Sequence, residues 1–182
     1  MKKTVRENFR LLRPRQWIKN LAMFASLIVS GQLFNQILLQ KVFVGFLVFC
    51  AMSSAIYVIN DIFDVKKDKL HPFKKFRPLA QENISIKTAV FIAAILSLSS
   101  IFISFFIAPA FFIITIVYFL LHVGYSALLK QIEIIDILTL AGGYILRVLA
   151  GEVVSGFHIS AWLLLTTIAL SLFLAIGKRR SE

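Results

Sequence analysis

Long apolar segments separated by short polar ones dominate the pattern of this chain. Four stretches contain no Lys, Arg, Asp or Glu, and they hold 21, 19, 42 and 25 residues. In order, they are residues 20–40, 42–60, 88–129 and 153–177. A helix needs about 20 apolar residues to cross the hydrocarbon core of a bilayer. The pattern therefore predicts membrane-spanning helices, not a soluble domain.

The same pattern predicts six crossings. The 42-residue stretch is long enough for two helices, with a turn at Ala108-Pro109-Ala110. A further apolar segment follows it and is interrupted by Asp136, Arg147 and Glu152. The expected crossings lie near residues 20–39, 42–63, 87–107, 110–129, 134–153 and 158–177. We therefore expect an all-α, polytopic transmembrane helical bundle that forms a single membrane domain over 1–182.

The basic residues gather on one side of this predicted membrane. If the N-terminus is cytoplasmic, 18 of the 20 Lys and Arg residues lie in or beside the inner segments. Those segments are 1–19, 64–86, 130–133 and the tail from 178. Cytoplasmic loops of membrane proteins carry this excess of basic residues. The net charge of +11 thus indicates an orientation in the cytoplasmic membrane, and nucleic-acid binding is not expected.

Two polar segments leave their roles open. Residues 1–19 are basic and interspersed with aromatic side chains, and Pro14 is expected to break or kink their helix. This interfacial segment fits either lipid anchoring or a substrate-facing role for Arg13, Lys19 or Asn20. The cytoplasmic loop 64–86 holds six cations, which suit either lipid headgroups or a polyanionic substrate.

Oxygen-bearing side chains cluster at the end of the second predicted crossing. At about 100° per residue, one helix face spanning about 100° would carry all four of them. They are Asn60, Asp61, Asp64 and Asp68. Such carboxylates repel one another and are costly near hydrocarbon, and Mg²⁺ bridged to substrate phosphates relieves both problems. The alternative is a solvated helix end whose acids pair with the lysines that follow.

The fifth predicted crossing carries charge within the membrane. Asp136 and Arg147 are 11 residues apart, which places them within about 20° on one helix face. An arginine inside a span should face protein or a watery cavity. It fits either pairing with a buried acid, which could be Glu152 or a residue elsewhere, or anchoring a phosphate. Glycines that lie on this face or permit close helix approach are Gly142, Gly143 and Gly151.

Several other polar residues have two interpretations each. Tyr125 and Lys130 end the fourth crossing, where Lys130 could reach lipid headgroups or a substrate. His71 fits a phosphate contact or a turn before Pro72. His122 and His158 are isolated from any partner at metal-ligand spacing, and a structural or interfacial role is expected for both.

The motif Asn60-x-x-x-Asp64-x-x-x-Asp68 resembles the first aspartate-rich motif of the UbiA superfamily of membrane prenyltransferases. The strings RPRQWIKN (13–20), INDIFDVKKDKLHPFKKFRPLA (59–80), YSALLK (125–130) and GKRRSE (177–182) are most similar to the decaprenyl-phosphate phosphoribosyltransferase branch. Members with aromatic substrates more often carry threonine where this chain has Phe76. Their second acidic motif is replaced here by Lys178-Arg179-Arg180-Ser181-Glu182.

The resemblance implies about nine helices around a central cavity open to the cytoplasm. This chain would supply the N-terminal two thirds of that fold, so we expect it to be truncated at its C-terminus. The implied activity is Mg²⁺-dependent transfer of phosphoribose from phosphoribosyl diphosphate to a polyprenyl phosphate. No general base is required, because the attacking phosphate oxygen is already an anion.

The resemblance also implies roles for particular residues. Asn60, Asp61, Asp64 and Asp68 would hold Mg²⁺, and Asn60, Asp64 and Asp68 would be catalytic. Substrate-binding roles are expected for Lys19, His71, Lys74, Lys75, Arg77, Tyr125, Lys130, Asp136, Arg147, Lys178 and Arg179. The alternatives are prenyl transfer from an allylic diphosphate to an aromatic or other acceptor, a cation transporter, and a non-catalytic lipid-binding remnant.

Overall fold

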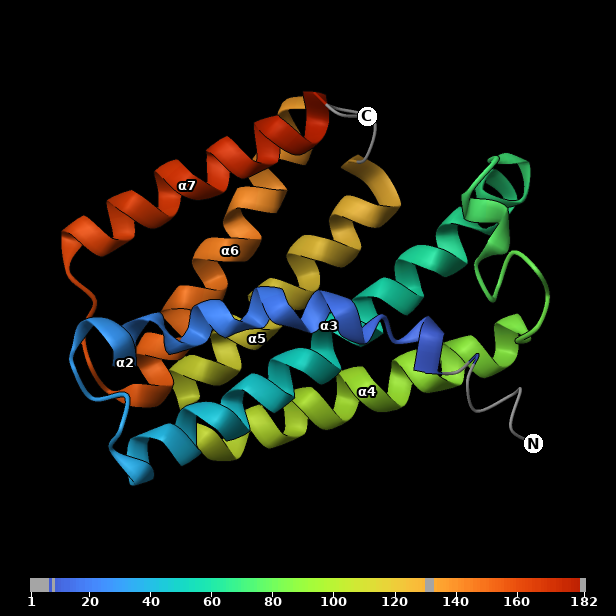
Figure 1. Ribbon diagram of the computed structural model, residues 1–182. Helices are drawn as coiled ribbons and strands as arrows, with labels where there is room; N and C mark the ends of the chain where they lie inside the picture. The colour runs from blue at the N-terminus through green and yellow to red at the C-terminus, as the bar shows by residue number, and fades with distance from the viewer. Residues whose placement is uncertain (1–6, 8, 130–132, 181–182) are drawn as a thin grey trace.

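The structure is a computed structural model that describes residues 7, 9–129 and 133–180. Within these residues the regular elements are all helical, which confirms the predicted class. In chain order they are η1 (Pro14–Phe24), α2 (Ala25–Val29), α3 (Gln36–Leu70), η2 (Lys74–Phe76), α4 (Ile86–Ile107), α5 (Pro109–Gly124), η3 (Tyr125–Leu129), α6 (Glu133–Ser155) and α7 (Ala161–Arg180). Figure 1 shows successive long helices running back and forth, with the α3–α4 connection at the right and the end of α7 at the top, near the middle of the view. The α2–α3, α4–α5 and α6–α7 connections lie towards the left, as alternating crossings require.

The first predicted crossing differs from a single α-helix over 20–39. It begins as the 3₁₀-helix η1, with Pro14 in its first turn, and continues as the short helix α2. The chain then turns at Gly31, whose φ of 71° suits glycine, and Asn35 caps α3 by accepting from the Leu38 amide. A 3₁₀-helix rises about 2.0 Å per residue, so η1 and α2 together reach roughly 30 Å. That length matches the hydrocarbon core although only 16 residues are used.

The second predicted crossing is longer than expected. Helix α3 extends 35 residues and ends at Leu70, so the first part of the predicted loop 64–86 is helical. Lysines and aspartates are compatible with helix, and the helix stops only before Pro72, which disfavours helical backbone at the residue before it. The extension places Asp64 and Asp68 on the same rigid helix as Asn60.

The predicted turn within the 42-residue apolar stretch is confirmed. Helix α4 ends at Ile107, and α5 begins at Pro109 with its proline in the first turn. Ala108 is extended, with φ −166° and ψ 144°, and separates the two helices by a single residue. Ser85 caps the start of α4 by accepting from the Thr88 amide.

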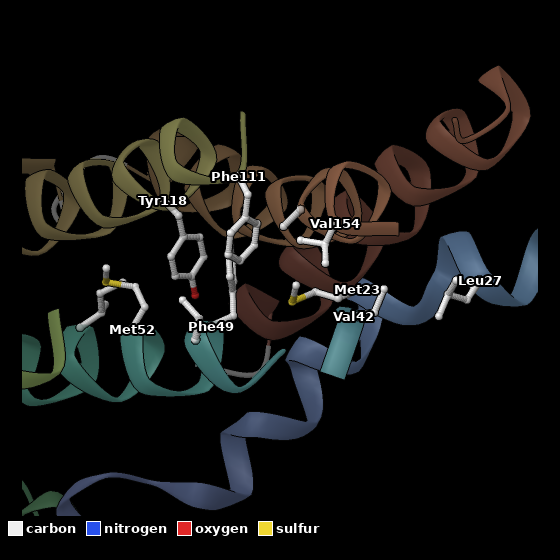
Figure 2. Close-up of a cluster of buried hydrophobic side chains, with 11 residues drawn as sticks. Met23, Leu27, Val42, Phe49, Met52, Phe111, Tyr118 and Val154 are labelled. Atoms are coloured by element: carbon white, nitrogen blue, oxygen red, sulfur yellow. The ribbon is translucent and has the colours of Figure 1, made fainter. Parts of the chain in front are cut away.

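Close packing joins η1 to α3 and α6. A Cβ at Gly151 would lie 1.8 Å from the Met23 carbonyl oxygen, so only glycine lets η1 contact the α6 backbone directly. A Cβ at Gly45 would lie 3.2 Å from atoms of both Met23 and Val154, which meet in the core. Figure 2 shows these two side chains beside Val42, with Phe49, Phe111 and Tyr118 further along the same core.

Large apolar side chains also cover the outside of the bundle. On α4, Phe91, Leu98 and Phe106 are each at least 66% exposed, and on α7 Trp162 and Phe173 are at least 73% exposed. Apolar surface of this extent is unfavourable in water and suits contact with lipid. The chain is therefore an integral membrane protein.

Four helices are long and apolar enough to cross a membrane, counted among the described residues. They are Gln36–Leu70, Ile86–Ile107, Pro109–Ala127 and Ile134–Ser155. A shorter apolar helix, Ala161–Gly177, and the η1–α2 segment occupy the places of the other two predicted crossings. About six crossings are thus consistent with the fold.

Candidate functional site

A cavity of about 420 Å³ lies between η1, α3, α5 and α6. Polar and charged side chains from each of these elements line it, together with residues of the loop after α3 and of the π-helical turn η3. Its residues come from positions 13 to 147, so the cavity exists only because the helices pack together. Most of the site residues expected from the sequence meet here.

Asn60 and Asp64 form one wall of this cavity. They are four residues apart on α3 and therefore lie on one face, where the Asn60 side-chain amide donates to Asp64 Oδ2 at 3.2 Å. Both are half-buried. The arrangement offers amide and carboxylate oxygens, which are ligands that Mg²⁺ prefers.

Asp61 and Asp68 occupy the other edge of the same helix arc and contact arginines. Asp61 is 2% exposed, and its Oδ1 lies 2.5 Å from Arg13 Nη2 and 3.1 Å from Arg77 Nη1. Arg77 Nη1 also lies 2.6 Å from Asp68 Oδ2. This network of two acids and two arginines ties the N-terminal segment and the loop to the end of α3. The four oxygen-bearing residues therefore divide into a pair that lines the cavity and a pair bound to arginine.

The donor set determines whether a metal ion fits this site. Among the residues that the structure describes, no three Asp, Glu, His or Cys side chains converge as a preformed metal cluster. Mg²⁺ is usually held by only one or two carboxylates while substrate phosphates and water complete its shell. The Asn60–Asp64 pair fits that mode of binding.

The loop cations fall into two groups. Lys74 and Arg77 line the cavity, whereas Lys75 is exposed with its ammonium 5.3 Å from the centre of the Phe76 ring. His71 Nδ1 accepts from the amides of Phe73 and Lys74 at 3.2 Å each, so it stabilises the turn after α3. These contacts favour the turn interpretation of His71.

A surface ion pair closes the same loop. Lys69 Nζ lies 2.5 Å from Glu82 Oε1, and this hydrogen bond and its positive charge lower the pKa of the Glu82 carboxyl. Glu82 has a φ of 59°, a left-handed conformation that is uncommon for residues other than glycine. Both partners are exposed, so the pair contributes little to stability.

The N-terminal segment contributes to the cavity as well as to the membrane interface. Arg13, Gln16 and Lys19 line it, which favours a substrate-facing role for Arg13 and Lys19. Trp17 donates from its indole nitrogen to Ser54 Oγ at 2.9 Å and so fastens η1 to α3. Gln16 was not expected at the site, because an uncharged side chain in a basic segment gives no sequence signal for a ligand contact.

Arg147 lies deep in the cavity and is 4% exposed. Its Nε donates to Asn20 Oδ1 at 2.7 Å, Nη1 to the Gly143 carbonyl at 2.7 Å and Nη2 to the Tyr118 hydroxyl at 2.5 Å. All three partners are neutral. Glu152, the acid proposed as its partner, instead lies 2.9 Å from His158 Nδ1. The structure thus contradicts an Arg147–Glu152 pair and leaves the phosphate-anchoring interpretation.

Tyr125 from η3 and Asp136 from α6 meet at the same cavity. The Tyr125 hydroxyl donates to Asp136 Oδ1, and both residues line the cavity. Tyr125 lies in η3, and such π-helical turns frequently occur at functional sites. Lys130 is outside the described residues, and so are the side chains of Lys178 and Arg179.

Several cavity residues were not expected from the sequence. Besides Gln16, they are Ser53, Tyr57, Tyr118, His122, Ser126 and Tyr144. Tyr57 precedes Asn60 by three residues and shares its helix face, a signal that was available. His122 looked isolated because its neighbours, Gly143 and Arg147, are distant in sequence.

These features define a class of protein: an integral membrane helical bundle with a cavity between its helices that is lined by charged and polar side chains. Comparison with known families then gives the particular one. The pattern of the UbiA prenyltransferase family matches residues 21–179, and the chain belongs to this family.

Curated relatives agree with that assignment. The decaprenyl-phosphate phosphoribosyltransferase of Corynebacterium glutamicum is 39% identical over 175 residues, covering 94% of this chain and 53% of the relative. The enzyme of the same name from Mycolicibacterium smegmatis is 38% identical, covering 94% and 55%. The nodulation protein NoeC of Azorhizobium caulinodans is 29% identical, covering 93% and 55%. The chain therefore spans about half the length of these relatives.

Solved structures show the same fold. A UbiA homolog from Archaeoglobus fulgidus bound to GPP and Mg²⁺ superposes with a TM-score of 0.81 at 23% identity. The match covers 95% of this chain and 62% of that one. The same homolog bound to DMAPP and Mg²⁺ gives a TM-score of 0.79, covering 93% and 62%. The helical fold described above is thus the UbiA fold over the residues that match.

Proposed function

We propose that this chain carries the donor site of a Mg²⁺-dependent transferase that moves phosphoribose from phosphoribosyl diphosphate to a polyprenyl phosphate. The observation that carries the proposal is the composition of the cavity. The Asn60–Asp64 pair and the cations Lys19, Lys74 and Arg77 line one space, which suits a diphosphate that binds with a divalent cation. The similarity to decaprenyl-phosphate phosphoribosyltransferases supports the choice of donor.

The donor diphosphate would lie between α3 and the loop. Asn60 and Asp64 would hold Mg²⁺, which when bound supplies positive charge to the diphosphate oxygens. Lys74 and Arg77 would neutralise the negative charge that develops on the departing pyrophosphate. Asp61 and Asp68 would act through Arg77, because their carboxylates fix the position of its guanidinium. The magnesium-bound solved homolog supports Mg²⁺ at the level of the family.

The chemical step is a displacement at the ribose anomeric carbon. An oxygen of the polyprenyl phosphate would form the new bond to that carbon as the bond to the diphosphate oxygen breaks. Pyrophosphate leaves with the electron pair of the broken bond. Because the nucleophile is an anion, none of the cavity residues has to remove a proton.

A groove beside this cavity would suit the acceptor lipid. It has a volume of about 410 Å³ and is lined by η1, α2, α6 and α7, chiefly by apolar side chains. Lys19 and Tyr144 line both the groove and the cavity, so they mark where the two spaces meet. A polyprenyl chain would lie in the groove with its phosphate near Lys19. The basic loop and N-terminus would face the cytoplasm, as the distribution of Lys and Arg indicates.

Prenyl transfer from an allylic diphosphate is the second candidate. It is favoured by the fold match to the Archaeoglobus fulgidus homolog, which was solved with GPP and with DMAPP. Both reactions would use the same Asn60–Asp64 pair. They differ in the group attached to the donor diphosphate, which is phosphoribose in the first reaction and a prenyl chain in the second.

A donor assay distinguishes the two reactions. Membranes that contain the chain receive polyprenyl phosphate and Mg²⁺ with either labelled phosphoribosyl diphosphate or labelled geranyl diphosphate. The proposal expects label in the lipid fraction from phosphoribosyl diphosphate, dependent on Mg²⁺. Label that enters lipid only from geranyl diphosphate would overturn it in favour of prenyl transfer.

A further inference from the structure

The inner end of the cavity has an unusual composition for a membrane interior. The buried guanidinium of Arg147 is surrounded by Asn20, Tyr118, Tyr144 and the Gly143 carbonyl, and lies 5.0 and 5.5 Å from the two tyrosine ring centres. None of the described carboxylates lies within ion-pair distance of it. A buried charge with only neutral partners is costly. An anion beside Arg147 would neutralise this charge.

Arg147 retains donors for such an anion. A guanidinium has five N–H groups, and the hydrogen bonds to Asn20, Gly143 and Tyr118 use three of them. One N–H on each terminal nitrogen is left over. Two N–H groups on a planar fork match the oxygens of a phosphate.

His122 lies beside this guanidinium. Its ring lines the cavity and meets Tyr118 edge-to-face with ring centres 4.5 Å apart, and its buried Nε2 has no hydrogen-bond partner among the described residues. A Cβ at Gly143 would lie 2.8 Å from His122 Nε2 and 3.3 Å from Arg147 Nη1. Glycine at this position thus makes room for both side chains. An unsatisfied buried nitrogen is unfavourable, and a ligand hydroxyl or phosphate would satisfy it.

This inner end of the cavity lies at a distance from the diphosphate site, measured along α3. Asn20, which holds Arg147, donates to Ser53 Oγ at 3.1 Å. Ser53 is seven residues before Asn60 on α3, which corresponds to about 10 Å along the helix. The two ends of the cavity are therefore suited to opposite ends of one donor molecule.

We infer that Arg147 and His122, with Tyr118, form a second anion subsite, which binds the terminal phosphate and hydroxyls of a phosphorylated sugar. This inner subsite determines donor specificity, and it deepens the proposed function, on which it rests. A sugar phosphate supplies the anion and the hydrogen bonds that the subsite lacks. An allylic chain would bury the guanidinium against hydrocarbon and supply neither.

Binding of donor fragments tests the inner subsite. Ribose 5-phosphate carries the terminal phosphate without the diphosphate. Pyrophosphate with Mg²⁺ supplies the diphosphate without the sugar phosphate. Calorimetry on the chain in lipid nanodiscs measures both. We expect Arg147→Gln to weaken ribose 5-phosphate binding roughly 10- to 100-fold, because it removes charged hydrogen bonds. His122→Phe should weaken this binding about fivefold or more, because it removes a neutral hydrogen bond. Pyrophosphate affinity should change by less than about twofold, since its site is distant.

Control variants distinguish loss of the inner subsite from misfolding and from failure of the proposed reaction. Arg15→Gln makes the same charge change at an exposed position and should bind both ligands like the unaltered chain. His122→Phe keeps the ring against Tyr118, so it decides the matter if Arg147→Gln does not fold. Ribose 5-phosphate affinity unchanged by both substitutions would overturn the inner subsite alone. An unaltered chain that binds geranyl diphosphate but not ribose 5-phosphate would overturn both the subsite and the phosphoribosyl reaction.

Discussion

Arg77 folds back over the end of α3 and places its Nη1 2.6 Å from Asp68 Oδ2. Asp68 is nine residues earlier and only 4% exposed, so the loop after α3 is fixed by a largely buried ion pair. The same nitrogen contacts Asp61, which also binds Arg13. The cavity wall is thus built on a charge network that links three segments of the chain.

The network predicts that Asp68 acts on stability more than on ligand binding. Asp68→Asn removes one charge from the pair and should lower the free energy of unfolding by roughly 3 kcal/mol. Thermal unfolding in detergent measures the loss. Lys69→Gln, which breaks only the exposed pair with Glu82, should leave the melting temperature nearly unchanged. Equal effects of the two substitutions would contradict the structural role of Asp68.

Substitutions of two neighbouring lysines of the loop should differ in their effect on ligand affinity. Lys74 lines the cavity and Lys75 lies over Phe76 outside it. Lys74→Gln should weaken Mg²⁺–pyrophosphate binding about tenfold, or about 1.4 kcal/mol, through loss of a charged contact. Lys75→Gln, with the same change in net charge, should weaken it by no more than about twofold. Calorimetry at two salt concentrations checks both, and a larger loss in the Lys75 variant would refute the assignment.

Close packing at Gly151 should tolerate no side chain. Gly151→Ala would place a Cβ 1.8 Å from the Met23 carbonyl and push η1 away from α6. We expect a destabilisation of about 1–3 kcal/mol or more, together with weaker ligand binding, because η1 carries Lys19. Gly142→Ala is the matched control on the same helix, since its Cβ would make an ordinary 3.5 Å contact with Leu121. Equal melting temperatures for the two variants would contradict direct η1–α6 backbone contact.

A carboxylate at position 20 should neutralise the charge of Arg147. Asn20→Asp would place a carboxylate where Asn20 Oδ1 now accepts from Arg147 Nε at 2.7 Å. The resulting ion pair would compete with a ligand anion, so ribose 5-phosphate affinity should fall at least about tenfold while the chain still folds. Asn20→Gln is the uncharged comparison. Undiminished affinity in the Asn20→Asp chain would show that Arg147 does not contact the ligand.

Much of the fold follows from local features that the sequence displays. Pro109 divides the 42-residue apolar stretch, and Ser85 caps the helix that precedes it, because both effects depend on neighbouring residues alone. The form of the first crossing was not predictable in this way. Its 3₁₀ geometry accompanies the contact between Met23 and Gly151, which are far apart in sequence.

The site shows the same limit. Helical spacing places Asn60, Asp61, Asp64 and Asp68 on one arc of α3. It could not show which of them line the cavity and which bind arginine. That division depends on Arg13 and Arg77, which reach Asp61 from outside α3. Likewise, His122 gains its neighbours only when α5 packs on α6.

Binding of pyrophosphate to the Asp64→Asn chain shows whether Asn60 and Asp64 hold a diphosphate through Mg²⁺. Calorimetry in nanodiscs, with and without Mg²⁺, compares it with the unaltered chain and with Glu82→Gln, which changes an exposed acid. We expect Mg²⁺-dependent binding that Asp64→Asn weakens at least about 30-fold, or about 2 kcal/mol, and that Glu82→Gln leaves intact. Equal Mg²⁺-dependent affinity in all three chains would contradict a diphosphate site at Asn60 and Asp64.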